Sequence, residues 1–361
     1  MLSPPARILV TGANGYIGCW IVHELLDRGY SVRATVRTDE KACALSSLIT
    51  AKHPSLSPGA FECDLVPDMS AEGAFEKCLG GVQGIIHTAS PVNFEMEDPE
   101  DYIVPAVQGT MGIIKAAAKH QTVKRIVITS SVGAVAETLR TPEETHVYNE
   151  DDWNDYAVET VTALGKAAIG TDKYSASKVL AERAAWQFYD DNKDGLSFEL
   201  CTILPGWVFG TVLQPLPDDP PSPKHITSIT VKLAWDQLFA MPPPEPFLVD
   251  FSYVDVRDVA DIHIRALEME EAAGERFIAS PNLCTWQDWY DAAHDMDILP
   301  RLSKIHPPAT STEEKLPYPR LEYSSEKAKQ RLGMVFRPLE VTLRDTVDDF
   351  RKRGWLQHLE I

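Results

Sequence analysis

A glycine-rich turn between an apolar strand and a helix constrains the fold of this chain more than any other feature. The turn, residues 11–18 (TGANGYIG), follows the apolar run at 8–10 and opens a helical pattern at 20–26. A buried strand, a tight glycine turn and a helix start, in this order, are typical of a dinucleotide-binding βα unit. The glycine spacing is G-x-x-G-x-x-G rather than G-x-G-x-x-G. We therefore expect this segment to bind the pyrophosphate of a dinucleotide.

The three glycines are expected to have different backbone roles. Gly12 can turn the chain off the strand at positive φ, and Gly15, which lacks a Cβ, allows the backbone to approach a phosphate. Gly18 allows the helix to pack close to the sheet. The free N–H groups and the positive end of the helix would then face the phosphates.

Composition excludes several other classes of protein. The net charge of -19 argues against a nucleic acid or an anionic membrane as partner, because either would meet a repelling field. The six cysteines form no CxxC pair and no metal-like cluster with histidine, as expected for reduced thiols in a cytoplasmic protein. The first strand begins within a few residues of the N-terminus and no apolar run approaches transmembrane length, so we expect neither a signal peptide nor a membrane span.

Strand and helix patterns alternate through the first two thirds of the chain. Strands are predicted at 31–37, 61–65, 84–90, 125–131 and 198–205, and again at 251–255 and 276–279. This alternation predicts an α/β fold, a Rossmann-type doubly wound parallel sheet. Proline-rich segments at 215–223 and 241–244 and amphipathic helices near 286–294, 325–332 and 340–352 indicate a smaller C-terminal lobe. We expect an NADP-binding domain at 1–211 with a return segment at about 247–281, and a substrate-binding lobe at 212–361.

The end of the second predicted strand indicates the cofactor. Enzymes that prefer NAD usually place an acid there to bind the ribose 2′-hydroxyl, whereas this chain has Arg37, with Lys41 one helical turn later. Two cations suit the 2′-phosphate of NADP, which arginine can bind bidentately. The alternative is that both are surface charges beside Asp39 and Glu40. Asp64, at the end of the third strand, is expected beside the adenine.

A Tyr–Lys pair follows a strand that ends in hydroxyls. Residues 129–131 (TSS) end the fifth strand and are expected to point into the crevice at the strand ends, whereas His87 is interpreted as a packed core residue. The acid-rich segment 137–172 is interpreted as a surface insertion. Tyr174 and Lys178 then lie on one face of a long helix, because they are four residues apart.

Together, residues 11–18, Ser131 and the Tyr174/Lys178 pair resemble the extended short-chain dehydrogenase/reductases. Within that family the chain is similar to the dihydroflavonol 4-reductase and cinnamoyl-CoA reductase branch, especially its fungal NADPH-dependent aldehyde and ketone reductases. The similarity runs from about residue 7 to past residue 340 and includes residues 32–37, 149–154 and 255–260. Gln108 and Leu204 stand where many relatives carry asparagine.

The resemblance implies a Ser-Tyr-Lys mechanism without a metal. Tyr174 would protonate the carbonyl oxygen as a general acid, and the cation of Lys178 should lower the tyrosine pKa and bind the nicotinamide ribose. Ser131, which family alignment favours over Ser130, would hydrogen-bond the carbonyl oxygen. The predicted catalytic residues are therefore Ser131, Tyr174 and Lys178.

The predicted binding residues lie at the strand ends and in the exit loops. The cofactor-binding residues are Gly12, Asn14, Gly15, Tyr16, Ile17, Arg37, Lys41, Asp64, Leu65, Thr88, Ala89, Ser90, Thr129, Tyr174, Lys178, Pro205, Gly206 and Val208. The substrate-binding residues are Pro91, Val92, Phe94, Ser131, Trp207 and Met241. These mostly apolar residues predict an apolar or aromatic carbonyl substrate that is reduced by NADPH to an alcohol.

Three alternative functions remain. A sugar-nucleotide epimerase or dehydratase of the same superfamily would usually hold NAD tightly, and a hydroxysteroid-type dehydrogenase would work in the oxidative direction. A cofactor-sensing regulator would have no need for Ser131, Tyr174 and Lys178 together. The sequence leaves open the substrate, the stereochemistry and the oligomeric state.

Overall fold

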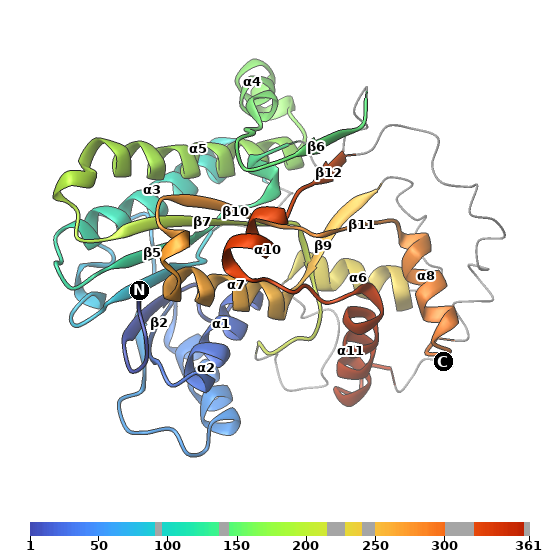
Figure 1. Ribbon diagram of the computed structural model, residues 1–361, viewed down its shortest axis with the longest axis horizontal. Helices are drawn as coiled ribbons and strands as arrows, with labels where there is room; N and C mark the ends of the chain where they lie inside the picture. The colour runs from blue at the N-terminus through green and yellow to red at the C-terminus, as the bar shows by residue number, and fades with distance from the viewer. Residues whose placement is uncertain (91–95, 137–143, 215–227, 240–249, 300–320, 357–361) are drawn as a thin grey trace.

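A parallel sheet with helices on both faces forms the larger part of the protein (Figure 1). The computed structural model describes residues 1–90, 96–136, 144–214, 228–239, 250–299 and 321–356. The sheet has seven strands in the order β10-β7-β5-β4-β1-β2-β3, all paired in parallel. This arrangement confirms the predicted Rossmann-type α/β fold.

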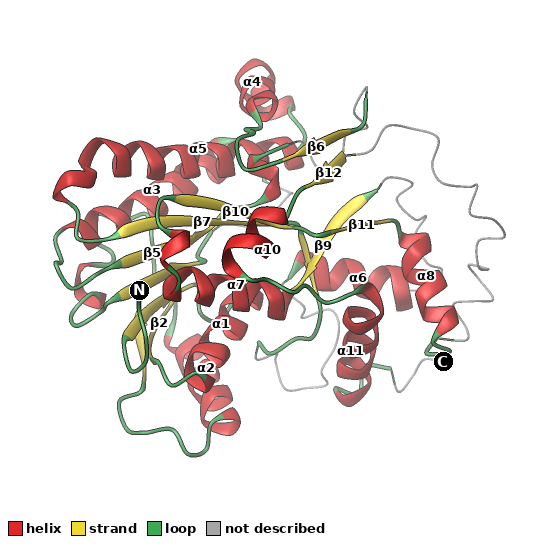
Figure 2. Cartoon of the chain, in the orientation of Figure 1, coloured by secondary structure: helices red, strands yellow, loops and turns green. Residues whose placement is uncertain are grey.

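The strands of this sheet agree with the apolar runs of the sequence. They are β1 (Arg7–Thr11), β2 (Ser31–Val36), β3 (Phe61–Leu65), β4 (Gly84–His87), β5 (Arg125–Thr129), β7 (Glu199–Pro205) and β10 (Glu275–Ala279). The helices between them are α1 (Tyr16–Asp27), α2 (Asp39–Lys52), α3 (Glu100–Ala118), α5 (Gly170–Asn192) and α7 (Val256–Glu268). Figure 2 shows these helices on both sides of the strands.

Alternation of side chains along each strand divides the core between the two faces. Ile8 and Val10 of β1 pack in the cluster formed with α1, α2 and α7, whereas Leu9 packs in the cluster formed with α3 and α5. Ile85 and Ile86 of β4 divide in the same way. Since both faces of each central strand are covered, these strands are apolar throughout rather than alternating with polar residues.

A smaller region lies beyond the carboxyl ends of the large sheet (Figure 1). It contains a three-stranded sheet of β8 (Trp207–Phe209), β9 (Phe251–Asp255) and β11 (Asn282–Cys284), in the order β11-β9-β8. The helices α6 (Ile229–Phe239), α8 (Trp286–Asp295) and α11 (Leu339–Lys352) surround an aromatic core with it. The predicted helices at 286–294 and 340–352 are confirmed by α8 and α11, and the one at 325–332 by α10 (Glu326–Leu332).

The chain leaves the large sheet earlier than the predicted domain boundary at residue 211. β7 ends at Pro205, and β8 already pairs with β9 in the small sheet. The return segment also divides, because β9 belongs to the small sheet while α7 and β10 belong to the large one. The assignment of the two domains remains a prediction.

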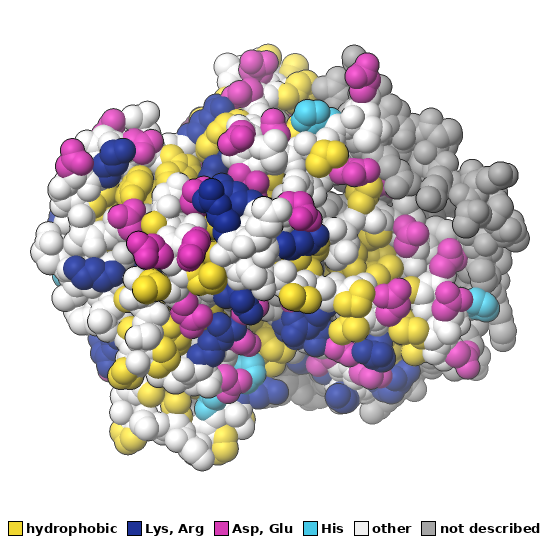
Figure 3. Space-filling model, in the orientation of Figure 1, with side chains coloured by type: hydrophobic (Ala, Val, Ile, Leu, Met, Phe, Trp, Pro, Cys, Tyr) yellow, Lys and Arg dark blue, Asp and Glu magenta, His cyan; other side chains and the backbone are white. Residues whose placement is uncertain are grey.

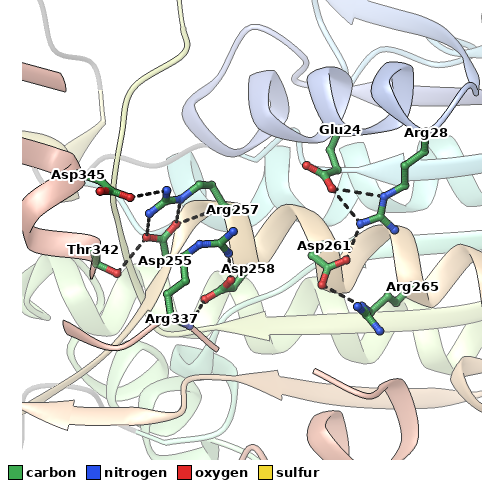
Figure 4. Close-up of polar contacts among 10 residues, drawn as sticks. All are labelled: Glu24, Arg28, Asp255, Arg257, Asp258, Asp261, Arg265, Arg337, Thr342 and Asp345. Atoms are coloured by element: carbon green, nitrogen blue, oxygen red, sulfur yellow. Dashed lines mark hydrogen bonds and ion pairs between the residues drawn. The ribbon is translucent and has the colours of Figure 1, made fainter. Parts of the chain in front are cut away.

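Ion pairs link α7 to α1 and to the smaller region, as Figure 4 shows. Arg28, the C-cap of α1, lies 2.5 Å from Asp261. Near the start of the same helix, Arg257 pairs at 2.7 Å with both Asp255 and Asp345, the latter on α11. On the face of the molecule that Figure 3 shows, acidic and basic side chains are also intermixed. Within the described residues, no helix combines the length and the hydrophobicity needed to span a bilayer.

The segment before α5 is more than the surface insertion that we predicted. Its described part, 144–172, contains β6 (His146–Tyr148), paired with β12 (Leu321–Tyr323), and α4 (Asp155–Leu164). Glu150 and Asn154 are buried, and the Glu150 carboxylate accepts a hydrogen bond of 3.0 Å from the backbone N–H of Ile278. This segment is therefore part of the packed structure beside β10.

Candidate active site

A cavity of about 380 Å³ opens at the carboxyl ends of the parallel strands. Its walls come from the segments that follow β1, β2, β3, β4, β5 and β7, with further residues from α5 and the start of α6. Ligands of open parallel α/β sheets bind outside the carboxyl ends of the strands. We call this space the strand-end cavity.

The glycine turn borders the strand-end cavity with bare backbone. Gly12 has φ +63, and a Cβ added there would lie 3.0 Å from the backbone of Ala89. A Cβ at Gly18 would lie 2.3 Å from the carbonyl oxygen of Gly12, so the first turn of α1 packs directly on the loop. Gly15 is the N-cap of α1 and supplies no side-chain cap, so the first N–H groups of the helix lack a side-chain partner. This bare helix start fits the pyrophosphate of a dinucleotide.

Two cations line the same cavity at the end of β2. Arg37 and Lys41 both border it, and neither forms a salt bridge with any residue that the structure describes. Lys41 is held in place by the start of α2, where its backbone N–H donates to the Thr38 hydroxyl at 3.3 Å. By contrast Arg33, within β2, is paired with Glu62 at 2.8 Å. Of these three cations, the two beside the cavity form no salt bridge with a described residue, which fits an anionic group larger than a ribose.

The predicted catalytic residues converge on the far wall of the cavity. Ser131 and Tyr174 line it, and their side chains are hydrogen-bonded to each other. Lys178 lies one turn further along α5, with its Nζ 5.8 Å from the centre of the Tyr174 ring and 3.4 Å from the carbonyl oxygen of Thr129. A hydroxyl pair and a buried amine thus lie together at the end of β5.

Comparison with known proteins assigns this arrangement to a family. Residues 8–279 match the model of the NAD dependent epimerase/dehydratase family. The chain belongs to this family. It is 32% identical to the NADPH-dependent methylglyoxal reductase GRE2 of Saccharomyces cerevisiae, over 96% of this chain and 98% of the relative. It is 31% identical to the cinnamoyl-CoA reductase CAD2 of Medicago truncatula, with 96% of each chain covered.

Solved structures place the chain in the same family. The yeast methylglyoxal/isovaleraldehyde reductase Gre2 complexed with NADPH is 30% identical and superimposes with a TM-score of 0.82, covering 97% of this chain and 99% of that chain. The predicted resemblance to the extended short-chain dehydrogenase/reductases of the dihydroflavonol 4-reductase and cinnamoyl-CoA reductase type is thereby confirmed. The protein is thus a carbonyl-reductase-like member of the epimerase/dehydratase family.

The pKa values of this family member's Tyr–Lys pair differ from the sequence-based expectation. Burial raises the pKa of Tyr174 to about 12, against a smaller lowering by the hydrogen bond with Ser131. Burial also lowers the pKa of Lys178 to about 8, against a smaller raising by the charge of Glu182. The protein's own groups therefore keep the tyrosine proton in place at neutral pH instead of favouring the phenolate.

Only one of the three hydroxyls at the end of β5 serves the cavity, so the prediction that all three point into it is wrong. Thr129 is engaged with His263 of α7: the His263 Nδ1 donates to the carbonyl of Val259 at 2.6 Å, which leaves its Nε2 to accept from the Thr129 hydroxyl at 2.7 Å. Ser130 donates to the Glu182 carboxylate at 2.6 Å. Because Thr129 and Ser130 are bonded to these buried partners, Ser131 is the hydroxyl of the three that lines the cavity.

Glu182, which the sequence analysis missed, is the centre of a buried polar network behind the predicted catalytic residues. Its side chain is 1% exposed and accepts from Ser130, from the Thr202 hydroxyl at 2.7 Å and from Arg276 Nε at 2.9 Å. The Arg276 guanidinium also covers the Trp153 ring at 3.7 Å. The signal was available in the sequence, because Glu182 follows Lys178 by four residues and so lies on the same helix face.

His87 has the structural role that the sequence predicted. It is buried, its Nδ1 lies 2.8 Å from the Thr11 hydroxyl, and burial lowers its pKa to about 3. A histidine that stays neutral at physiological pH and packs between β1 and β4 is a core residue.

The cavity contains most of the predicted binding residues. Those that line it are Gly12, Asn14, Gly15, Tyr16, Ile17, Arg37, Lys41, Thr88, Ala89, Ser90, Ser131, Tyr174, Gly206, Trp207 and Val208. Asp64, Leu65, Thr129, Lys178 and Pro205 are not among the lining residues, and Asp64 instead lies 3.5 Å from Arg33. Pro91, Val92, Phe94 and Met241 lie outside the described residues.

Other lining residues were not predicted. They are Gly18, Thr35, Val36, Val66, Met69, Phe75, Val132, Gly133, Thr171, Gln214, Ser228, Ile229 and Thr230. Val66 follows β3 directly, so its place at the cavity could have been inferred by the same argument that placed Asp64 there, namely its position at the strand end. Gln214 and the residues at the start of α6 follow no strand of the large sheet, and no motif marks them.

Proposed function

We propose that this protein is an NADPH-dependent carbonyl reductase that converts apolar or aromatic aldehydes and ketones to alcohols. The observation that carries the proposal is the presence of the Arg37/Lys41 cation pair and the Ser131/Tyr174 hydroxyl pair in one cavity. The first suits a 2′-phosphate, and the second suits a carbonyl oxygen. The relatives named as NADPH-dependent reductases support the same assignment.

The cofactor would extend along the strand ends of the sheet. The bare N-terminus of α1 would bind the pyrophosphate, and Arg37 with Lys41 would bind the 2′-phosphate. Thr88, Ala89 and Ser90, at the end of β4, would continue this wall toward the nicotinamide, whose ribose Lys178 would bind. Bound NADPH supplies a hydride to the carbonyl carbon.

The protein's own residues would deliver the proton and orient the oxygen. Tyr174 is the general acid of this proposal, since its raised pKa keeps its hydroxyl protonated at neutral pH. Ser131 would donate to the same carbonyl oxygen and fix its direction. Lys178, with its pKa lowered to about 8, would carry the next proton toward Tyr174 through the ribose hydroxyls.

The described wall on the substrate side has large apolar side chains and no charged ones. Trp207 comes from β8 and Ile229 from the start of α6, while Thr171, Gln214, Ser228 and Thr230 add uncharged polar groups. This composition favours carbonyl compounds with an apolar or aromatic body and few charges. The free thiols of all six cysteines fit the cytoplasmic location that we propose.

The main competing hypothesis is an epimerase, because the fold is shared. A solved epimerase, the UDP-glucose 4-epimerase of Bifidobacterium longum, is 16% identical with a TM-score of 0.65, which shows the fold alone. The unpaired cations at the end of β2 favour an exchangeable NADPH over a tightly held NAD.

A panel of aldehydes, ketones and α-keto acids tests the proposal through NADPH oxidation. We expect turnover with aromatic and medium-chain carbonyls, weak turnover with small anionic keto acids, and a changed substrate profile in Trp207→Ala. Conversion of sugar nucleotides without turnover of any carbonyl would show that the protein is an epimerase instead.

A further inference from the structure

A cluster of two histidines and an aspartate lies where α1 and α2 end. His23 and Asp27 are one turn apart on α1, and His53 is the C-cap of α2. The Nδ1 of His23 lies 2.9 Å from the Nε2 of His53. The Asp27 carboxylate lies 3.5 Å from the His23 Nε2 and 3.3 Å from the His53 Nδ1. One donor atom from each residue falls within 4.8 Å of the others.

We propose that His23, Asp27 and His53 form a binding site for a divalent transition-metal ion of the zinc type. Imidazole nitrogens and a carboxylate oxygen are ligands that Zn²⁺ takes, with bonds of about 2.0–2.2 Å. A tetrahedral ion with such bonds holds its ligand atoms about 3.3–3.6 Å apart. The His23 Nε2 lies 3.5 Å from Oδ2 of Asp27 and the His53 Nδ1 lies 3.3 Å from Oδ1, so each histidine is at this distance from a different oxygen of the carboxylate. Rotation of the carboxylate and of the histidine rings would bring one oxygen to both nitrogens.

The surroundings of the cluster allow an ion to enter and to be bound. Asp27 is 56% exposed at the end of α1, whereas His53 is 8% exposed, so the site is open on the carboxylate side and enclosed on the imidazole side. The nearby Glu24 is paired with Arg28 at 2.9 Å and is therefore not a competing ligand.

A hydrogen-bonded trio is the alternative explanation of the same contacts. The 2.9 Å contact between the two imidazoles can hold one proton, and the remaining ring nitrogens can face Asp27. In that case the cluster would link α1 to α2 without an ion. The two explanations differ in whether the protein binds one equivalent of metal.

The site is separate from the proposed chemistry. None of its three residues lines the strand-end cavity. It lies at the opposite end of α1 from the glycine turn, and at the opposite end of α2 from Lys41. A bound ion would join the two helices whose first turns border the cavity, so we expect it to stabilise this βαβ unit rather than to take part in hydride transfer.

Zn²⁺ titration of the full chain, produced without a histidine tag and freed of metal with a chelator, tests the proposal. We expect one tight Zn²⁺ equivalent by calorimetry, a rise in melting temperature with Zn²⁺, and the visible absorption of tetrahedral Co²⁺ when cobalt is used as the probe. His23→Gln and His53→Gln should each weaken the affinity by at least ~10–100-fold, the loss seen when even the outer-shell partners of metal ligands are removed.

Two matched controls exclude adventitious ligands. His120→Gln removes an imidazole elsewhere, and Cys43→Ser removes the exposed thiol of α2; both should bind Zn²⁺ like the parent protein. Asp27→Asn decides the outcome if a histidine variant fails to fold, because it alters an exposed side chain at a helix end. No stoichiometric Zn²⁺ binding at micromolar concentrations would overturn the proposal. So would a tight ion that survives in all three site variants or is lost in a control.

Discussion

The side of the strand-end cavity that we assign to the cofactor is formed by short runs of consecutive residues, each directly after a strand. The side that we assign to the substrate is assembled from separate segments, such as β8, Gln214 and the start of α6. On the first side, binding groups are backbone N–H groups and unpaired cations. Behind the second, at α5, the charged groups are buried and bonded to one another. This difference indicates that substitutions on the cofactor side should change binding, and those around α5 should change rate and stability.

The largest effect should separate chemistry from binding. Tyr174→Phe removes the proton donor but keeps the ring, so kcat should fall by ~10²–10⁴-fold, the usual contribution of general acid catalysis. The NADPH Kd and the melting temperature should stay close to those of the parent protein. Steady-state kinetics, cofactor titration and thermal unfolding measure the three quantities. A variant that loses stability but keeps its turnover per folded molecule would make Tyr174 a structural residue.

The next effect concerns the buried network. Glu182→Gln removes the carboxylate charge opposite Arg276, and breaking a buried pair typically costs about 3–5 kcal/mol. Because the charge of Glu182 raises the pKa of Lys178, its loss should also move the alkaline limit of kcat to lower pH. Chemical denaturation and a kcat–pH profile test both parts, with the exposed Glu76→Gln as control. An unchanged pH profile together with lost stability would leave Glu182 only a packing role.

The cofactor side should respond in the opposite manner. Replacing Arg37 and Lys41 by alanine should raise the KM for NADPH at least ~10-fold, since each charged hydrogen bond contributes about 1.5–3 kcal/mol. NADH kinetics and the melting temperature should barely change, because neither cation is paired with a described residue. Arg33→Ala, which breaks a pairing on the same strand outside the cavity, is the control. Equal losses with NADPH and NADH would refute the phosphate assignment.

The most gradual effect is the pH dependence of stability. Burial lowers the pKa of His263 from 6.5 to about 4, so the unfolded chain binds an additional proton between these values. The stabilisation is complete above pH 6.5 and decreases toward pH 4 at about 1.4 kcal/mol per pH unit. Asp258 acts in the opposite direction, because burial raises its pKa from 3.8 to about 6.

Comparing the parent protein with His263→Gln isolates the contribution of this histidine to the pH dependence. The free energy of unfolding of His263→Gln should lose this slope between pH 6.5 and 4, whereas that of His120→Gln should keep it. Parallel curves for the parent protein and His263→Gln would show that His263 does not stay neutral in the fold.

The same comparison explains what the sequence could predict. The positions of the glycine turn, Arg37 and Tyr174 at the cavity are set by local backbone geometry, namely a positive φ, a strand end and a helix face. The positions of Thr129 and Ser130 depend on which buried partner each hydroxyl reaches, His263 or Glu182, and those partners come from distant segments. No local pattern carries that information.

Two further expectations that the structure overturned have the same physical origin. Glu150 and Asn154 belong to an acid-rich segment that a composition argument places at the surface, yet β10 and the 3-10 turn after β5 bury them. The raised pKa of Tyr174 also follows from burial, whereas the sequence shows only the nearby lysine. The Tyr–Lys motif therefore predicts where the site lies, whereas the pKa values of its residues depend on tertiary packing.

Transfer of deuterium from labelled NADPH tests the central claim most directly. The protein is incubated with NADPH deuterated at the transferred position of the nicotinamide and with an aromatic aldehyde or ketone. We predict one deuterium on the carbinol carbon of the product for each NADPH oxidised, with the same label position but a much lower rate in Tyr174→Phe. Alcohol without deuterium, or no NADPH oxidation by any carbonyl while sugar nucleotides are interconverted, would contradict the account.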